Sequence, residues 1–255
     1  MPIKVPDNLP ALRDLHAESV DIIPQKQAVR QDIRPLRLLL LNLMPKKRDT
    51  EIQFARLFGN TPLQVEMILM TTASYTPQNT EPGYLRRFYR QLNDVQDDYF
   101  DALIVTGAPI ETLPFEDVKY WEELTEIMEW SREHCFRRLG ICWGAQALLW
   151  HFHKVQKHEL GAKLFGIFKH HLSDVSGRLM HGFTDQFPMP ASRYTMNRGV
   201  DLAAAGLNVL AEGEECGVGM VRDPKTGDLF VFNHLEYDAT TIGDEYHRDL
   251  AAGLN

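Results

Sequence analysis

Residues 139–146 have the sequence Leu-Gly-Ile-Cys-Trp-Gly-Ala-Gln, in which Cys142 stands between two glycines at the end of a short apolar run. This pattern is typical of a nucleophile elbow, a sharp turn from a strand into a helix that exposes a reactive side chain at the sheet edge. Gly140 and Gly144 suit the turn because side chains there would collide with the strained backbone. The start of the following helix favours a thiolate at Cys142. A cysteine packed inertly at a strand end is the alternative interpretation.

The chain before the elbow alternates apolar runs with amphipathic segments. The expected strands lie at residues 36–44, 63–70 and 100–105 and directly before Cys142, and the expected helices at 49–58, 84–92, 120–135 and 143–153. The strand runs are apolar on both faces, as buried parallel strands require. Four such units predict an α/β fold with a doubly wound, mostly parallel sheet flanked by helices. Ligands of such sheets bind beyond the carboxyl ends of the strands.

The two ends of the chain have different patterns. Residues 1–35 are interrupted by prolines, so we expect an N-terminal arm on the surface, with a core that begins at Leu36. Residues 36–255 are expected to form a single α/β domain. Near the C-terminus, segments 216–222 and 229–234 predict a hairpin around a polar turn, followed by a helix at 240–252.

Composition excludes several functional classes. The 255 residues carry a formal charge of −8, which argues against nucleic-acid binding. No apolar segment resembles a secretory signal or a membrane span, so a cytoplasmic enzyme is expected. The three cysteines, Cys135, Cys142 and Cys216, form no CxxC pair, and Cys216 is interpreted as structural. His151 and His153, like the adjacent His170 and His171, lack the spacing of metal ligands, so no metal is expected.

A base for the cysteine follows the last predicted strand, in the triplet His234-Leu235-Glu236. In extended chain, residues two apart point to the same face, so Glu236 can orient the imidazole of His234. Cys142, His234 and Glu236 are therefore predicted to act as nucleophile, base and orienting group. Backbone N–H groups of Gly107 and Ala108, together with that of Trp143, are candidates for an oxyanion hole.

These segments carry a family resemblance. Thr106-Gly107-Ala108-Pro109, the Cys142 elbow and His234-Leu235-Glu236 resemble the class I glutamine amidotransferase fold, which is flavodoxin-like. The further segments Asn42-Leu43-Met44-Pro45-Lys46-Lys47, Ser192-Arg193-Tyr194 and Glu236-Tyr237-Asp238 are similar to the homoserine O-acyltransferase family of methionine biosynthesis. The resemblance extends over nearly the whole chain.

The resemblance implies acyl transfer from an acyl-CoA to the hydroxyl of L-homoserine through a Cys142 thioester, with no cofactor and with a homodimer as the assembly. It places Lys163, Ser192 and Arg248 at the substrate, where the Arg248 guanidinium can pair with a carboxylate. Family members with glutamate at the position of Glu111 resemble acetyltransferases, and those with glycine resemble succinyltransferases. A carboxylate at this position would repel a succinyl group, so acetyl-CoA is expected as the donor.

Other activities stay open at this point. The same chemistry could use succinyl-CoA, or L-serine as the acceptor, because one methylene discriminates only about 1–3 kcal/mol. A glutaminase-type amidotransferase subunit and a catalytically silent binding protein are the alternatives from other classes. Relatives typically continue beyond residue 255 with an aromatic-rich segment, so the resemblance also implies a longer chain or a short member.

Overall fold

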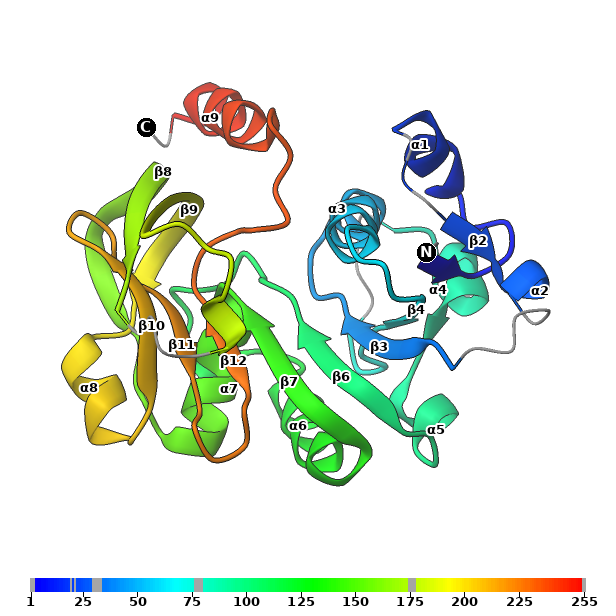
Figure 1. The fold of residues 1–255 in the computed structure, drawn as a ribbon, viewed down its shortest axis with the longest axis horizontal. Helices are drawn as coiled ribbons and strands as arrows, with labels where there is room; N and C mark the ends of the chain where they lie inside the picture. The colour runs from blue at the N-terminus through cyan, green and yellow to red at the C-terminus, as the bar shows by residue number, and fades with distance from the viewer. Residues whose placement is uncertain are drawn as a thin grey trace.

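The computed structural model describes residues 3–18, 20, 22–28, 34–75, 80–173 and 178–253. Within these residues, twelve strands form one sheet that runs across the molecule (Figure 1). The strands are β1 (Ile3–Val5), β2 (Ile22–Pro24), β3 (Leu36–Leu41), β4 (Val65–Met70), β5 (Tyr89–Arg90), β6 (Phe100–Val105), β7 (Cys135–Ile141), β8 (His158–Leu172), β9 (Gln186–Met196), β10 (Asn208–Gly213), β11 (Gly217–Arg222) and β12 (Leu229–Val231). The helices are α1 (Leu12–Ala17), α2 (Gln25–Ala28), α3 (Lys47–Gly59), α4 (Pro82–Phe88), α5 (Leu92–Val95), α6 (Trp121–His134), α7 (Trp143–His153), α8 (Gly199–Ala204) and α9 (Thr241–Ala251), with short 3₁₀ turns η1 (Phe115–Asp117) and η2 (Arg178–Met180).

The sheet has a parallel part and an antiparallel part. Its strand order is β2-β1-β4-β3-β6-β7-β12-β11-β10-β8-β9, and β5 pairs with β4 outside this path. Pairing is parallel from β2 to β12 and antiparallel from β12 to β9. This confirms the expected α/β fold with a doubly wound, mostly parallel sheet.

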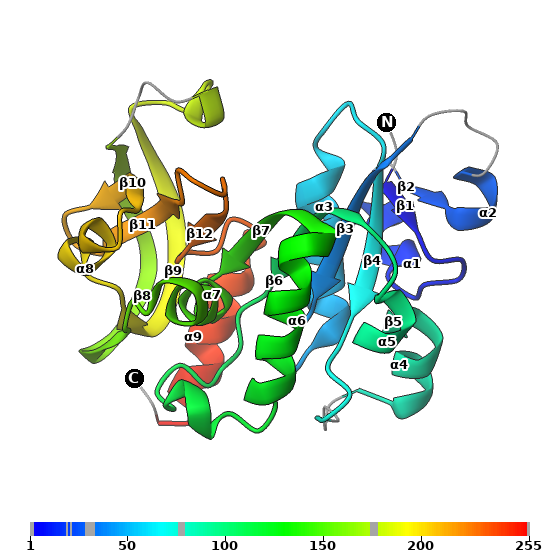
Figure 2. The same cartoon turned by 90° about the horizontal axis from the view of Figure 1, so that it is seen from below.

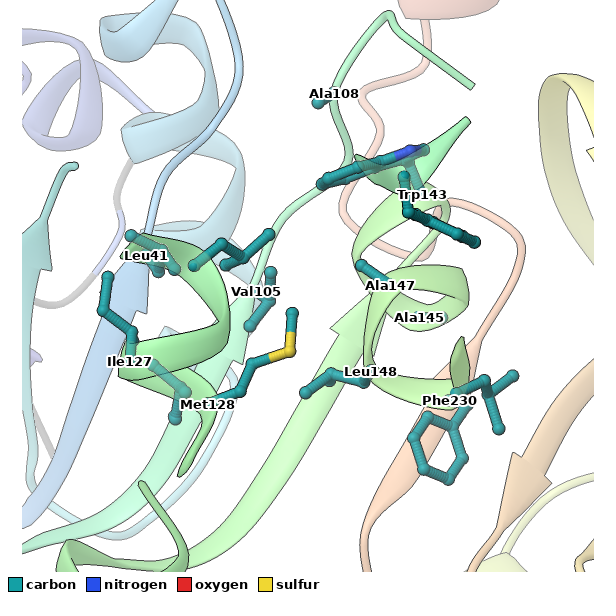
Figure 3. Close-up of a cluster of buried hydrophobic side chains, with 14 of the residues drawn as sticks. Leu41, Val105, Ala108, Ile127, Met128, Trp143, Ala145, Ala147, Leu148 and Phe230 are labelled. Atoms are coloured by element: carbon teal, nitrogen blue, oxygen red, sulfur yellow. The ribbon is translucent and has the colours of Figure 1, made fainter. Parts of the chain in front are cut away.

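Hydrophobic residues form a layer on each face of the sheet. Helices α6 and α7 cover one face, and α1 and α3 cover the opposite face (Figures 1 and 2). Leu148 of α7 and Met128 of α6 pack with Leu41 and Val105 of the sheet, and Trp143 extends this cluster towards Ala108 (Figure 3). Burial of these layers on both faces explains why the central strands are apolar throughout.

The register brings the carboxyl ends of four neighbouring strands to one edge. Leu41 pairs with Val105, Val105 with Gly140, and Ile141 with Val231. The segments that follow β3, β6, β7 and β12 therefore meet at this edge. Those segments contain the residues that the sequence analysis selected as catalytic.

The expectation that the core begins at Leu36 is wrong. Strands β1 and β2 extend the parallel sheet beyond β4, and the side chains of Val5, Leu9 and Leu15 are at most 1% exposed. Within the described residues, this segment therefore packs into the body of the molecule rather than lying over it as an arm. Residues 1–2, 19, 21 and 29–33 of the expected arm lie outside the described residues.

Other expectations hold in part. The hairpin of β11 and β12, the elbow helix α7 and the last helix α9 are confirmed. The helix expected at 84–92 is wrong beyond Phe88, because Tyr89 and Arg90 leave the helix to pair with the end of β4. No helix of the described residues combines the length and the apolar character needed to cross a membrane.

Candidate active site

Cys142 occupies a strained turn between β7 and α7. Its φ of 50° and ψ of −117° lie outside the conformations that side-chain-bearing residues usually adopt. A Cβ on Gly140 would lie 2.4 Å from the Cα of Ala145, and one on Gly144 would lie 2.3 Å from the carbonyl oxygen of Val105. Both glycines are therefore required by close backbone contacts, as the elbow pattern predicts.

His234 and Glu236 lie beside this turn, directly after β12. The Nδ1 of His234 is 2.7 Å from Oε1 of Glu236, and the imidazole also shares a hydrogen bond with the side chain of Cys142. All three side chains are buried, with 8% or less exposed. The backbone N–H of His234 donates to the carbonyl oxygen of Pro190, which fixes the segment against β9.

The environment of His234 favours the imidazolium form. Burial alone would lower the pKa of this imidazole, but the negative charges of Glu236 and Cys142 and its hydrogen bonds to both outweigh burial. The pKa of His234 therefore lies well above its ordinary value. The ring of Tyr237 stacks on His234, with centroids 4.1 Å apart and planes at 15°, which further fixes the imidazole. This arrangement can hold a proton close to the sulfur of Cys142.

The loop after β6 approaches the cysteine from the other side. A Cβ built on Gly107 would lie 3.4 Å from the Cβ of Cys142 and 3.8 Å from Cε1 of His234. Within the described part of the chain, the backbone N–H groups of Gly107, Ala108 and Trp143 donate no hydrogen bond to any acceptor. Three free donors therefore lie on elements that flank Cys142.

The catalytic pocket at this edge has a volume of about 440 Å³. Its wall includes the residues that the resemblance placed at the substrate, together with the catalytic candidates: Gly107, Ala108, Glu111, Cys142, Lys163, Ser192, His234 and Arg248. Trp143 contributes to the turn itself, and its side chain is fully buried against Phe115 and Tyr120. Glu236 stands behind His234 rather than in the wall.

Charged side chains of both signs line the pocket. The Nζ of Lys163 is 2.5 Å from Oδ2 of Asp249, and Nη2 of Arg248 is 2.7 Å from Oδ1 of the same carboxylate. Ser192 donates from Oγ to Oε2 of Glu245 at 2.6 Å. A pocket with both cationic and anionic groups suits a zwitterion such as an amino acid.

Among the other wall residues, the sequence analysis assigned no role to Tyr237, Glu245 and Asp249. The hydroxyl of Tyr237 donates to Oε1 of Glu245, so α9 is bound to the segment that carries His234. Charged residues of a surface helix usually face solvent, and these gave no separate signal. The spacing of Glu245 and Asp249, four residues apart on the helix that carries Arg248, could have indicated a shared face.

Glu111 lies in the pocket wall in a partly buried position. Burial raises the pKa of this carboxyl, although a backbone hydrogen bond and the positive charges of Lys163, His234 and Lys157 act in the opposite direction. Lys157 fixes the loop because its Nζ donates to the carbonyl oxygens of Glu111 and Leu113, each at 2.5 Å. The loop that carries Glu111 is thus anchored beside the pocket that Cys142 also lines.

A second cysteine–histidine pair lies outside the pocket wall. The sulfur of Cys216 is 3.1 Å from Nε2 of His170, and both residues are buried. Burial raises the pKa of the Cys216 thiol. Cys216 therefore offers a matched comparison for Cys142, since each cysteine contacts one histidine.

Comparisons with known proteins identify the family of this chain. Residues 2–255 match the model of the homoserine O-succinyltransferase family. A homoserine O-acetyltransferase of Synechococcus elongatus is 51% identical over 255 residues, covering all of this chain and 85% of the relative. A protein of the same name from Allorhizobium ampelinum is 48% identical and covers all of this chain and 82% of the relative.

Several solved structures with this fold are glutamine amidotransferases. One from Thermotoga maritima has a TM-score of 0.61 at 12% identity, and covers 87% of this chain and 86% of its own. The glutaminase domain of a Trypanosoma brucei protein has a TM-score of 0.52 at 12% identity, and the match covers 87% of this chain and 95% of that domain. Identities this low show only the class I glutamine amidotransferase-like fold. The family match over almost the whole length shows more: this chain belongs to the homoserine O-succinyltransferase family of acyltransferases.

Proposed function

We propose that the protein transfers an acetyl group from acetyl-CoA to the side-chain hydroxyl of L-homoserine, giving O-acetyl-L-homoserine and CoA for methionine biosynthesis. The observation that carries this proposal is the pocket in which Cys142 and His234 meet Lys163, Ser192 and Arg248. A nucleophile, its base and a mixed set of charges share one wall. The names of the relatives support the same acceptor.

In the first half-reaction, the thiolate of Cys142 attacks the carbonyl carbon of acetyl-CoA. The new bond joins that carbon to Sγ, and the bond to the CoA sulfur breaks. CoA leaves as a thiol after taking the proton held by His234. The free N–H groups of Gly107, Ala108 and Trp143 are the donors for the oxyanion of the tetrahedral intermediate. One thioester replaces another, so the step costs little free energy.

In the second half-reaction, neutral His234 takes the proton of the homoserine hydroxyl, whose oxygen attacks the acetyl carbonyl carbon. The bond between that carbon and Sγ breaks, and Cys142 leaves as a thiolate beside the imidazolium. Glu236 stabilises this imidazolium through its 2.7 Å contact with Nδ1. Ping-pong kinetics follow, because CoA departs before the acceptor reacts.

We assign the α-amino and α-carboxylate groups of the acceptor to the polar side of the catalytic pocket. This polar wall consists of Glu111, Lys163, Ser192, Glu245, Arg248 and Asp249. Lys163 and Arg248 are the cations for the α-carboxylate, and their pairing with Asp249 holds them in place before substrate binds. Glu245 and Glu111 are the carboxylates available to the α-ammonium group. Ser192, which donates to Glu245, belongs to the same wall.

Glu111 supports acetyl over succinyl as the transferred group. The family model is described by succinyl transfer, whereas the relatives above are named for acetyl transfer. A carboxylate in a partly desolvated pocket repels the free carboxylate of a succinyl group more strongly than it would in water. The acetyl group carries no such charge.

Intact-protein mass spectrometry tests the proposal. Incubation with acetyl-CoA is expected to add one acetyl group to the wild type, and added L-homoserine is expected to remove it while O-acetyl-L-homoserine forms. The adduct is expected to disappear in Cys142→Ala.

Cys216→Ala is the matched control, because Cys216 is also buried and also contacts a histidine. This variant is expected to keep the adduct. An adduct that persists in Cys142→Ala, or a wild type that reacts with a glutamine analogue and not with acetyl-CoA, would contradict the proposal. The second result would favour glutaminase chemistry.

A further inference from the structure

A second cavity of about 310 Å³ adjoins the catalytic pocket. It shares four wall residues with that pocket: Met44, Pro45, Ala108 and Pro109. Met44 and Pro45 follow β3, and Ala108 and Pro109 follow β6. Strand β3 lies between β4 and β6, so the chain passes from β3 to β4 on one side and then continues to β6 on the other side. The chain thus reverses its direction across the sheet at this point, where open α/β sheets bind their ligands. The two cavities therefore lie side by side at this point of the sheet edge.

The two cavities differ in chemistry. Charged side chains line the catalytic pocket around Cys142. Most side chains in the wall of the second cavity are apolar, among them Leu43, Ile110 and Leu113, and fewer are charged, namely Lys47, Asp117 and Lys119. It also includes Thr71 and Thr72, whose hydroxyls make no hydrogen bond within the part of the chain that the structure describes. Free hydroxyls in an apolar wall can recognise isolated polar groups on an otherwise apolar ligand.

The loop after β6 separates the two cavities and contributes to both. Glu111 and Thr112 line the catalytic pocket, whereas Ile110 and Leu113 line the second cavity. A ligand that passes Pro109, which lines both cavities, can place one end beside Cys142 and the other in the second cavity.

We propose that the second cavity binds the pantetheine arm of the acyl-CoA donor, an assignment that rests on the proposed function. The arm is a narrow chain with a dimethyl carbon and two amides, which match the apolar wall and the threonine hydroxyls. Its thioester end must reach Cys142 without filling the polar wall that the acceptor needs. The cavity volume lies at the lower end of the ~300–1,000 Å³ range of small-molecule sites.

A bulky substitution at Leu113 tests the assignment. Leu113 is 43% exposed, so a larger side chain can enter the cavity without repacking the core. Leu113→Trp is expected to raise KM for acetyl-CoA by about tenfold or more, with kcat nearly unchanged. Acetylation of Cys142 by p-nitrophenyl acetate, which has no pantetheine arm, is expected to proceed at the wild-type rate.

Two further variants make the test specific. Thr72→Val removes a hydroxyl at constant size and is expected to raise KM for acetyl-CoA by about threefold to tenfold. Leu63→Trp is the control, because Leu63 is 54% exposed and lies before β4, at the opposite end of the strands. Leu63→Trp is expected to leave the kinetics with acetyl-CoA and with p-nitrophenyl acetate unchanged.

The outcomes separate this assignment from the proposed function. If acetyl-CoA does not acetylate wild-type Cys142, the proposed function and the cavity assignment both fail. If it does, and Leu113→Trp and Thr72→Val leave its KM unchanged, only the cavity assignment is overturned. An equal loss with p-nitrophenyl acetate in both variants also overturns it, because that result places the damage at Cys142 itself.

Discussion

In the proposed function, the choice of acyl group depends on Glu111. Its carboxylate lines the catalytic pocket, and the loop that carries it is held by Lys157. Glu111→Gly is expected to raise the ratio of kcat/KM for succinyl-CoA to that for acetyl-CoA by about tenfold, because one desolvated like-charge contact is removed. Glu111→Gln is the control of equal size and is expected to give part of the same change. An unchanged ratio in both variants would contradict the assignment.

The protonation of Glu111 predicts a pH dependence of the same ratio. Burial raises the pKa of this carboxyl, so it becomes neutral at a higher pH than an exposed glutamate. The repulsion exists only in the charged form and therefore grows as the pH rises through that pKa. Preference for acetyl-CoA is expected to increase over this interval in the wild type. In Glu111→Gly, the ratio is expected to keep only the pH dependence that comes from the succinyl carboxylate itself. If the pH profiles of the ratio are parallel in the wild type and in Glu111→Gly, this explanation is excluded.

The elbow between β7 and α7 is an element whose geometry can be tested directly. A Cβ on Gly144 would lie 2.3 Å from the carbonyl oxygen of Val105, which is backbone of a central strand and cannot move away easily. Gly144→Ala is expected to lower the free energy of unfolding by at least ~2 kcal/mol, measured by urea denaturation, and to reduce acetylation of Cys142. Gly161→Ala, where no atom lies within 4 Å of the added Cβ, is expected to change stability by less than ~0.5 kcal/mol.

The elements that sequence predicted best are those with a simple burial pattern. Strands β3 and β6 are covered on both faces, so their apolar runs were recognisable. Strands β8 and β9 belong to the antiparallel part and carry many polar residues, and even Ile167 of β8 is 65% exposed. Their pairing depends on contacts far apart in the chain, which no local pattern reports. The three-residue strand β1 is too short to give a periodic signal.

At the scale of the whole molecule, the site could be predicted where local sequence determines geometry. The two elbow glycines determine the turn at Cys142, and the two-residue spacing places Glu236 beside His234. Lys163, Ser192 and Arg248 came only from the family resemblance, because they reach the pocket from β8, β9 and α9. Glu245 and Asp249 were missed for the same reason. The polar wall is a product of tertiary packing, whereas the elbow at Cys142 and the pairing of His234 with Glu236 are each fixed by local sequence.

Unfolding experiments can show whether the N-terminal residues 3–18 unfold together with the rest of the chain. Leu15 of α1 is fully buried, in the same hydrophobic layer as Phe54 of α3. Leu15→Ala removes buried packing contacts, and alanine keeps the helix propensity of α1. If residues 3–18 unfold together with the rest of the chain, this loss of packing destabilises the whole molecule. The expected loss in the free energy of unfolding is then about 2–5 kcal/mol, with an unchanged urea m-value and a single transition. His16→Ala, on the exposed side of the same helix, is the control and is expected to change stability by less than ~0.5 kcal/mol. A separate early transition, or a wild-type midpoint for Leu15→Ala, would instead mean that this segment is an independent arm.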